Sequence, residues 1–191
     1  MKSDIIVAGV GGQGIVSIAA LIGAAALDMG LNLKQSEVHG MSQRGGDVLS
    51  NLRLSDKEIA SDLIPFGMAD IIISMEPLEG LRHLQRLSMD GWLITNSKAY
   101  NNISNYPDID KVHEEIKKVK YHVLIDADQI AKDIGARRSV NVVLLGAASD
   151  HLGLNPEIIE KAIVKMFGRK GDKVVQQNLE ALHKGLEFAR K

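Results

Sequence analysis

The stretch VAGVGGQGIVS, residues 7–17, decides the fold. It continues an apolar run that begins at Ile5 and shows no polar alternation, which is typical of a strand buried on both faces. Gly9, Gly11 and Gly14 stand in G-x-G-x-x-G register, the pattern of a tight turn that holds a phosphate at the N-terminus of the following helix. The stretch therefore predicts strand, turn and helix, with the turn as a candidate site for an anion or a nucleotide.

The residues from Gly14 to Met29 are rich in Ala, Leu and Ile and predict a helix that stops at Gly30. Few polar side chains interrupt it, so it is apolar on almost every side. A helix of this kind has to be buried on every side. We expect it to be covered either by a second layer of the same domain or by a partner.

Short apolar runs alternate with helical patterns through the middle of the chain, at residues 70–75, 92–95 and 121–125. Alternating strands and helices favour a mainly parallel sheet that is covered on both faces. Residues 48–54 and 57–60, on either side of Ser55-Asp56, predict two short strands around a tight turn. The sheet is therefore expected to be mixed.

The last third predicts helices, at residues 140–152, 156–167 and 172–189, with Asn155 as an N-cap and Pro156 at the first helical position. We interpret the apolar positions of the last helix as packing on the domain's own core rather than as a seam for a partner. Without repeats or linkers, residues 1–191 are predicted to form one domain, a three-layer α/β/α Rossmann-like sandwich with a mainly parallel, mixed sheet and a helical C-terminal third.

Composition excludes several classes of function. With 191 residues, of which 45% are hydrophobic, the chain can bury a sizeable core. A net charge of −1 and 4% aromatic residues offer no platform for nucleic acid, and we interpret Arg137-Arg138 and Arg169-Lys170 as solvated helix ends and loops. No apolar segment is long enough to span a bilayer, so no membrane partner and a cytoplasmic protein are expected.

The sequence contains no cysteine, which excludes thiolate catalysis and every Cys-ligated zinc or iron–sulfur site on this chain. Its six histidines are scattered without a metal-spaced pair, so we predict no metal site. No Ser/His/Asp order and no pair of catalytic carboxylates emerges either. The chain is therefore not expected to catalyse a reaction alone.

A second unusual stretch, SEVHGMSQRGG, covers residues 36–46. Glu37 lies roughly 20 residues after the glycine turn, where a dinucleotide-binding protein places its ribose-binding acid. The polar glycine loop that follows does not fit such a protein. Within it, Arg44 could bind a phosphate or carboxylate through two hydrogen bonds, and His39 could titrate near neutrality.

The residues after each strand are further candidates because ligands of open α/β sheets bind beyond the carboxyl ends of the strands. These second-tier residues are Met75, Glu76, Asn96, Ser97, Asp126 and Asp128. Asp126, with Gln129 three residues later, is better interpreted as a helix cap. In the glycine turn, Gly12 adds bare backbone, and Gln13 can both donate and accept hydrogen bonds at the helix mouth.

These motifs together resemble the gamma-type subunits of the 2-oxoacid:ferredoxin oxidoreductases, and within that family the small beta subunit of the indolepyruvate enzymes. The resemblance spans nearly the whole chain and rests on GVGGQG, SEVHGMSQRGG, LRLSDKEIASDLIP, ADIIISMEP, NVVLLGA and QNLEALHKGLEFA. Relatives that act on pyruvate carry a Glu-Arg-Arg-Gly type of segment where this chain has Ser42-Gln43-Arg44-Gly45-Gly46. That difference favours indolepyruvate over pyruvate.

The resemblance implies that a 2-oxoacid is decarboxylated on thiamine diphosphate, that electrons pass through iron–sulfur clusters to ferredoxin, and that coenzyme A captures the acyl group. Thiamine diphosphate and the clusters are then expected on a larger partner subunit, while this chain contacts coenzyme A or the substrate. The residues carried over as cofactor-binding are Gly9, Gly11, Gly12, Gln13 and Gly14 of the glycine turn, and Glu37, His39, Gln43, Arg44 and Gly45 of the second loop.

Three alternatives stay open. The chain could serve a pyruvate, 2-oxoisovalerate or 2-oxoglutarate oxidoreductase instead. It could be an independent module that binds NAD(P) or FAD. A nicotinamide dehydrogenase is disfavoured, because no acid–base pair suited to hydride transfer stands out.

Overall fold

A six-stranded mixed sheet forms the centre of the computed structural model, which describes residues 1–40, 45–101 and 103–191. Its strands lie in the order β2-β3-β1-β4-β5-β6. Their bounds are β1 Lys2–Val10, β2 Asn32–His39, β3 Asp47–Ser55, β4 Ala69–Ser74, β5 Leu87–Asn96 and β6 His122–Ile125. β1, β4, β5 and β6 run parallel, whereas β3 pairs antiparallel with both β1 and β2. The predicted mixed sheet is confirmed.

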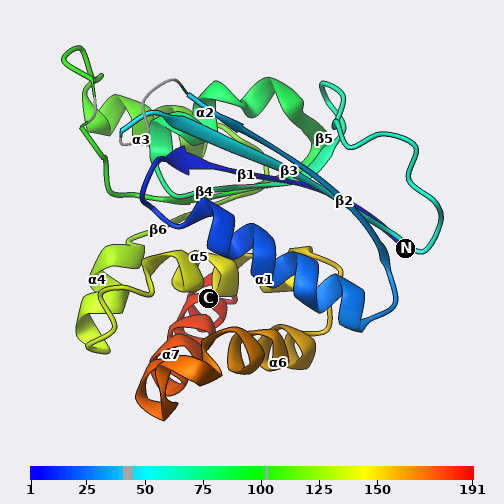
Figure 1. Ribbon diagram of the computed structural model, residues 1–191. Coiled ribbons are helices and arrows are strands. Elements are labelled where there is room, and N and C mark those ends of the chain that lie inside the picture. Colours follow the sequence, from blue (N-terminus) through cyan, green and yellow to red (C-terminus); the bar gives the residue numbers. More distant parts are fainter. Residues whose placement is uncertain (41–44, 102) are drawn as a thin grey trace.

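Helices cover both faces of the sheet (Figure 1). On one face lie α2 (Pro77–Arg82) and α3 (Ile109–Lys117), with the short 3-10 turn η1 (Leu84–Arg86). The other face is covered by α1 (Ile15–Asp28) and α5 (Val140–Ala148), and the remaining helical elements lie on the same side. These are α4 (Ala127–Asp133), η2 (Ser149–His151), α6 (Pro156–Phe167), η3 (Gly168–Lys170) and α7 (Asp172–Ala189). The three-layer arrangement and the helical C-terminal third agree with the sequence-based prediction.

The apolar side chains of β1 contribute to the hydrophobic cores on both faces of the sheet. Ile5 and Val7 belong to the core under α1 and α5, and Ile6 and Ala8 to the core under α2 and α3. All four side chains are fully buried. Successive side chains of a strand point to opposite faces, so a strand between two helical layers needs apolar residues at every position.

The predicted hairpin is in a different place. β3 pairs with β2, not with residues 57–60, which form no strand. Arg53 explains the irregular course after β3, because its guanidinium donates to the carbonyl oxygens of Ser61 and Leu63, each at 3.2 Å. The β2 sequence, NLKQSEVH, is mostly polar because it forms the edge of the sheet, and its hydrophobic pattern was too weak to predict it.

Helix α1 is mostly buried by its own domain, but part of its surface remains exposed. It packs on the sheet and against α6, and most of its apolar side chains are buried. Val16 and Leu27 remain exposed, at 52% and 59%. The domain itself therefore leaves one stripe of the helix uncovered, and cover of this stripe by a partner stays a prediction.

Several helix ends follow the sequence-based prediction. The Asn155 side chain accepts a hydrogen bond from the Glu157 N–H at 3.0 Å, and Pro156 opens α6. Asp126 accepts from the Gln129 N–H at 2.8 Å and caps α4. The helix predicted over residues 140–152 ends earlier, at Ala148, and continues as the 3-10 turn η2. Among the helices that the structure describes, none combines the length and the apolar character needed to cross a bilayer.

Candidate functional site

The glycine turn follows β1 and docks on the start of α5. Gly14 is the N-cap of α1 and adopts a left-handed φ of +87°, which a residue with a Cβ rarely adopts. Asn141 of α5 donates a hydrogen bond from Nδ2 to the Gly14 carbonyl oxygen at 3.4 Å. A Cβ on Gly14 would lie 2.5 Å from the same Nδ2. Both the backbone conformation and the close approach of α5 require glycine here.

The side chain of Gln13 holds the turn in place. Its Oε1 accepts a hydrogen bond from the Val10 N–H at 2.8 Å, and its Nε2 donates to the Met75 carbonyl oxygen at 3.3 Å. The amide thus joins the end of β1 to the end of β4. The hydrogen-bonding capacity predicted for Gln13 is used within the protein, and its contribution is to shape the turn.

A pocket of about 900 Å³ opens between the glycine turn, the carboxyl ends of the strands and the helical layer. The turn contributes Gly12, Gln13 and Gly14, α1 contributes Ser17, and the strand ends contribute Met75 and Asn96. The remaining lining residues are Tyr100, Asp128, Gly135, Ala136, Arg137, Arg138, Ser139, Val140, Asn141, Phe167, Lys170, Val174, Gln177 and Asn178. The pocket therefore lies where the open-sheet rule predicts a ligand.

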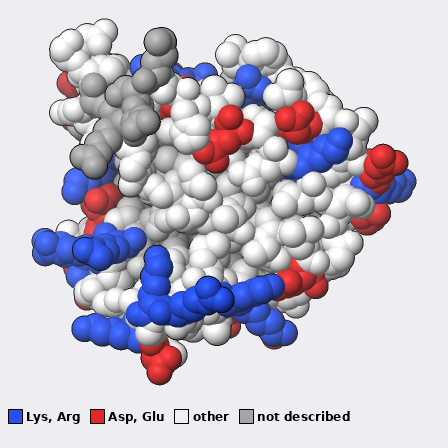
Figure 2. Space-filling view, in the orientation of Figure 1, with Lys and Arg blue, Asp and Glu red and all other residues white. Residues whose placement is uncertain are grey.

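The rim of this pocket is cationic. Arg137 and Arg138 precede α5, and Lys170 lies in η3, and all three are exposed side chains that line the pocket. Figure 2 shows Lys and Arg gathered over the end of the molecule formed by α4, α6 and α7. The N-cap residue of α5, Ser139, makes no side-chain capping hydrogen bond, but the Asn141 Oδ1 accepts from the Val142 N–H at 3.0 Å. The N–H groups that stay available at this helix start are therefore those of Val140 and Asn141, and both residues line the pocket. Cations and a helix N-terminus together favour an anionic ligand.

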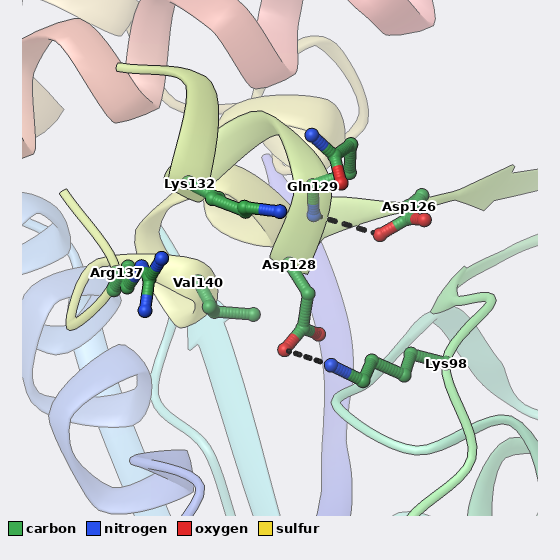
Figure 3. A pocket seen from close by; sticks show the side chains of 7 residues that line it. All are labelled: Lys98, Asp126, Asp128, Gln129, Lys132, Arg137 and Val140. Atoms are coloured by element: carbon green, nitrogen blue, oxygen red, sulfur yellow. Dashed lines mark hydrogen bonds and ion pairs between the residues drawn. The ribbon is translucent and has the colours of Figure 1, made fainter. Parts of the chain in front are cut away.

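A smaller hollow of about 390 Å³ continues the pocket toward α4 (Figure 3). Its lining residues are Lys98, Asp126, Asp128, Gln129, Lys132, Arg137 and Val140. Asp128 faces Lys98 in this view, and the Lys98 Nζ lies 3.4 Å from the Asp128 Oδ1. Asn96 donates to the other carboxylate oxygen at 2.8 Å. Asp128 is the only acid among the described residues that line the main pocket. Asn96 and Lys98 stabilise its negative charge.

The predicted site residues of the second loop lie in different parts of the structure. Glu37 and His39 lie on β2 at the sheet edge, where the His39 Nε2 and the Glu37 Oε1 are in contact. Neither lines the pocket, and β3 separates their strand from β1. A ribose-binding acid would stand on the strand next to β1. The ribose position suggested by the spacing of Glu37 is therefore wrong.

The described C-terminal end of the second loop nevertheless reaches the glycine turn, and its two described ends are joined to each other. The Gly11 N–H donates to the Gly46 carbonyl oxygen at 2.9 Å, and the Gly40 N–H to the Asp47 carbonyl oxygen at 2.7 Å. Gly45 adopts a left-handed φ of +78°. Gln43 and Arg44, the other two predicted residues of this loop, lie outside the described residues.

Of the second-tier candidates, Met75, Asn96 and Asp128 line the pocket as predicted. Glu76 instead has a structural role: it is buried, and its carboxylate accepts from the Glu79 N–H at 2.9 Å and from the Tyr100 N–H at 3.3 Å. It also accepts from the Tyr106 hydroxyl. Burial and this carboxylate together raise the pKa of Tyr106 above its usual range.

The sequence-based prediction missed the cations of the pocket. It interpreted Arg137-Arg138 and Arg169-Lys170 as solvated loops, and these side chains are indeed exposed. Three of them nevertheless line the pocket. One signal was present, because Arg137 and Arg138 directly precede the start of a predicted helix, where an anion would bind.

Known proteins are similar to this chain over nearly its whole length. The family model for pyruvate ferredoxin/flavodoxin oxidoreductase matches residues 4–188. Indolepyruvate oxidoreductase subunit IorB of Archaeoglobus fulgidus is 34% identical, over 99% of this chain and 96% of that protein. The subunit of the same name from Thermococcus kodakarensis is 35% identical, over 98% of this chain and 96% of its own length.

Two solved structures share the fold. One is the 2-oxoglutarate:ferredoxin oxidoreductase from Magnetococcus marinus with 2-oxoglutarate, coenzyme A and succinyl-CoA bound, which matches 99% of this chain and 31% of its own at 25% identity and a TM-score of 0.79. The other is the pyruvate oxidoreductase subunit PORC from Thermotoga maritima, at 26% identity and a TM-score of 0.73, with 98% of this chain and 96% of that one covered. The chain belongs to the pyruvate ferredoxin/flavodoxin oxidoreductase family.

Proposed function

We propose that this chain is the small subunit of an indolepyruvate:ferredoxin oxidoreductase. In that enzyme an aryl 2-oxoacid is oxidatively decarboxylated to an acyl-CoA, and electrons pass to ferredoxin. Relatives named as indolepyruvate oxidoreductase subunits support the proposal, because they are 34% and 35% identical to the chain over nearly their whole length. More distant relatives serve other 2-oxoacids, with 26% identity to a ketoisovalerate oxidoreductase subunit and 24% to a 2-oxoglutarate synthase subunit.

The pocket is proposed to receive the phosphate groups of coenzyme A. The observation that carries this assignment is the meeting of Arg137, Arg138 and Lys170 with the start of α5 and the glycine turn around one cavity of about 900 Å³. Coenzyme A bears a diphosphate and a 3′-phosphate, which guanidinium groups and helix N-termini both bind well. The structural relative from Magnetococcus marinus, described with coenzyme A bound, is consistent with this ligand.

The residues of the pocket are suited to binding rather than to chemistry. Its one described acid, Asp128, is held by Asn96 and Lys98, so it has no free role as a base. The sequence also has no cysteine to ligate a cluster. We therefore assign thiamine diphosphate and the iron–sulfur clusters to a larger partner subunit, and we place the assembled complex in the cytoplasm.

Within that complex, residues 1–191 are proposed to act as one domain. Gly12, Gln13 and Gly14 of the glycine turn would form the floor of the coenzyme A site, whereas Gly9 and Gly11 do not line the pocket and would only shape the turn. The second loop, with Gln43 and Arg44, is proposed to face the partner's active site. Support for this placement comes from the hydrogen bond between Gly11 and Gly46, which fixes the end of that loop beside the turn.

Copurification and turnover test the proposal. The chain should copurify with a larger subunit that contains thiamine diphosphate and iron–sulfur clusters. The complex should reduce ferredoxin with indolepyruvate and coenzyme A faster than with pyruvate, 2-oxoisovalerate or 2-oxoglutarate. If the isolated chain reduced ferredoxin from indolepyruvate unaided, the proposal would be wrong. A preference for one of the other three acids would reassign the substrate but keep the role of the subunit.

A second candidate, an independent dinucleotide-binding module, draws support from the glycine register and the left-handed Gly14. The position of Glu37 on the edge strand counts against it, because β3 separates this acid from β1 and the glycine turn. Titration calorimetry separates the two candidates. Tight binding of NAD(P) or FAD without binding of coenzyme A would favour the module.

A further inference from the structure

Three side chains with metal-binding atoms meet at one end of the sheet, on the face covered by α2. Asp47 is the first residue of β3 and pairs with Val10 at the end of β1. Glu79 lies in α2, and His83 is the C-cap of that helix. Residues four apart on a helix share a face, so α2 directs Glu79 and His83 to the same side. None of the three lines the pocket proposed for coenzyme A.

Their ligand atoms converge. One carboxylate oxygen each from Asp47 and Glu79 and one imidazole nitrogen of His83 lie within 4.8 Å of one another. The His83 Nε2 lies 3.8 Å from the Asp47 Oδ1, which is longer than a hydrogen bond. The distance leaves room for an ion to bridge the two atoms.

Two of these atoms have no hydrogen-bond partner although they are buried. The Glu79 side chain is only 4% exposed, and neither its Oε2 nor the His83 Nε2 makes a hydrogen bond to any residue that the structure describes. A buried polar atom without a partner costs about 1–3 kcal/mol, and more when it is charged. Two such atoms on neighbouring side chains point to a ligand that satisfies both.

Arg82 does not occupy the free oxygen of Glu79. It approaches through the other carboxylate oxygen, with its Nε 3.4 Å from Oε1, and leaves Oε2 free. This oxygen therefore remains available to an ion that also contacts Asp47 and His83.

We propose that Asp47, Glu79 and His83 bind a divalent first-row transition-metal ion. One imidazole and two carboxylates are ligands that zinc, manganese and iron accept, whereas calcium requires six to eight oxygen atoms. Three protein ligands leave a further position for water or for a group of a partner. The ion would join the start of β3 to α2 and so fix the end of the second loop, and its binding would stabilise the fold.

The histidines alone gave no sign of such a site. The sequence-based prediction of no metal site considered pairs of histidines, and this cluster contains only one. The spacing of Glu79 and His83 was visible in the sequence, but the third ligand comes from a strand that β1 and β4 bring beside α2. Only the sheet topology makes Asp47 a neighbour of that helix.

Calorimetric titration of the metal-free full chain with Zn²⁺ tests the proposal. We expect one ion to bind per chain. The Asp47→Asn, Glu79→Gln and His83→Gln variants should each bind Zn²⁺ at least about tenfold more weakly, because even residues that only support metal ligands change affinity by 10–100-fold. His183→Gln is the matched control: His183 and Glu160 form an exposed pair with 2.8 Å between Nε2 and Oε1, and offer no third ligand.

Asp47→Asn should remove a ligand without unfolding the protein, because the Asp47 side chain is half-exposed and only its backbone takes part in the sheet. Circular dichroism of each variant in EDTA should match that of the parent chain. Added Zn²⁺ should raise the melting temperature of the parent and of His183→Gln, but not that of Asp47→Asn. Binding of equal strength in all four variants and the parent, or no saturable binding at one equivalent, would overturn the proposal.

Discussion

Gly185 of α7 packs against Val143 of α5 so closely that a Cβ on Gly185 would lie 1.9 Å from the Val143 carbonyl oxygen. The reverse contact is equally tight, with a Cβ on Gly146 falling 2.0 Å from the Leu182 carbonyl oxygen. The two glycines let the helix backbones touch. The same two helices line the pocket, α5 with Asn141 and α7 with Asn178, so this crossing joins two of its walls.

Replacement of Gly185 should therefore separate the two helices. We expect Gly185→Ala to lower the free energy of unfolding by about 3 kcal/mol, since backbone atoms cannot rotate away from the new methyl group. Urea unfolding followed by circular dichroism measures the change. Gly168→Ala is the control, because no atom lies within 4 Å of a Cβ placed there and its φ is not positive. A loss of similar size in both variants would show that the crossing is not the cause.

Glycine is required at position 14 for two reasons, its left-handed φ and its close contact with Asn141, and variants can separate their effects. Gly14→Ala should destabilise the protein by about 1–2 kcal/mol through its left-handed φ alone, and further through the contact with Asn141. Gly30→Ala isolates the first effect, because Gly30 has a φ of +72° and open space around it. Thermal unfolding should show a larger loss for Gly14→Ala than for Gly30→Ala. Adding Asn141→Ala to Gly14→Ala should recover part of the difference, and equal losses in the two single variants would contradict the close docking of α5.

Glu79 predicts a pH dependence of stability for the metal-free protein. The pKa of this carboxyl is raised from 4.5 to about 7 by burial, so the folded state holds its proton more tightly than the unfolded state does. The stabilisation is present below pH 4.5 and is lost as the pH rises through 7. In EDTA, Glu79→Gln should flatten this fall, and at pH 8 it should exceed the parent in stability by roughly 2 kcal/mol. Parallel unfolding curves of parent and variant from pH 4 to pH 8 would refute the assignment.

The role proposed for Arg44 is based on the sequence alone. We expect Arg44→Ala to lower the activity of the assembled complex, because a guanidinium between Gln43 and two glycines is suited to a phosphate or carboxylate. The melting temperature of the isolated chain should stay the same. Steady-state turnover of the complex is the measurement, and unchanged turnover would remove Arg44 from the site.

The sequence predicted those parts of the fold in which a single segment carries its own signal. The strand–turn–helix unit at Gly9–Gly14 and the caps at Asp126 and Asn155 depend on neighbours in the chain, and all formed as expected. The edge strand β2 was missed as a partner of β3, because an exposed strand has no apolar pattern and its pairing depends on distant residues. Local chemistry could be predicted, whereas non-local pairing could not.

The same distinction between local and non-local features applies to the candidate site. The glycine turn and the strand-end residues Asn96 and Asp128 could be placed from rules about open sheets. The contribution of Lys170 could not, because it depends on how the C-terminal helices fold back over the carboxyl ends of the strands. Glu37 was misleading for a related reason, since its distance along the chain imitates a ribose-binding acid while β3 separates its strand from β1.

The Michaelis constant for coenzyme A tests the central claim most directly. In the assembled complex, Arg137→Ala/Arg138→Ala should raise the KM for coenzyme A by about tenfold or more, because a hydrogen bond to a charged group contributes about 1.5–3 kcal/mol. The kcat at saturating coenzyme A should change little, since these residues bind the phosphate end rather than the reacting thiol. Arg169→Ala, which removes an exposed arginine that does not line the pocket, should leave both constants as they are. An unchanged KM in the double variant would contradict the assignment of this pocket to coenzyme A.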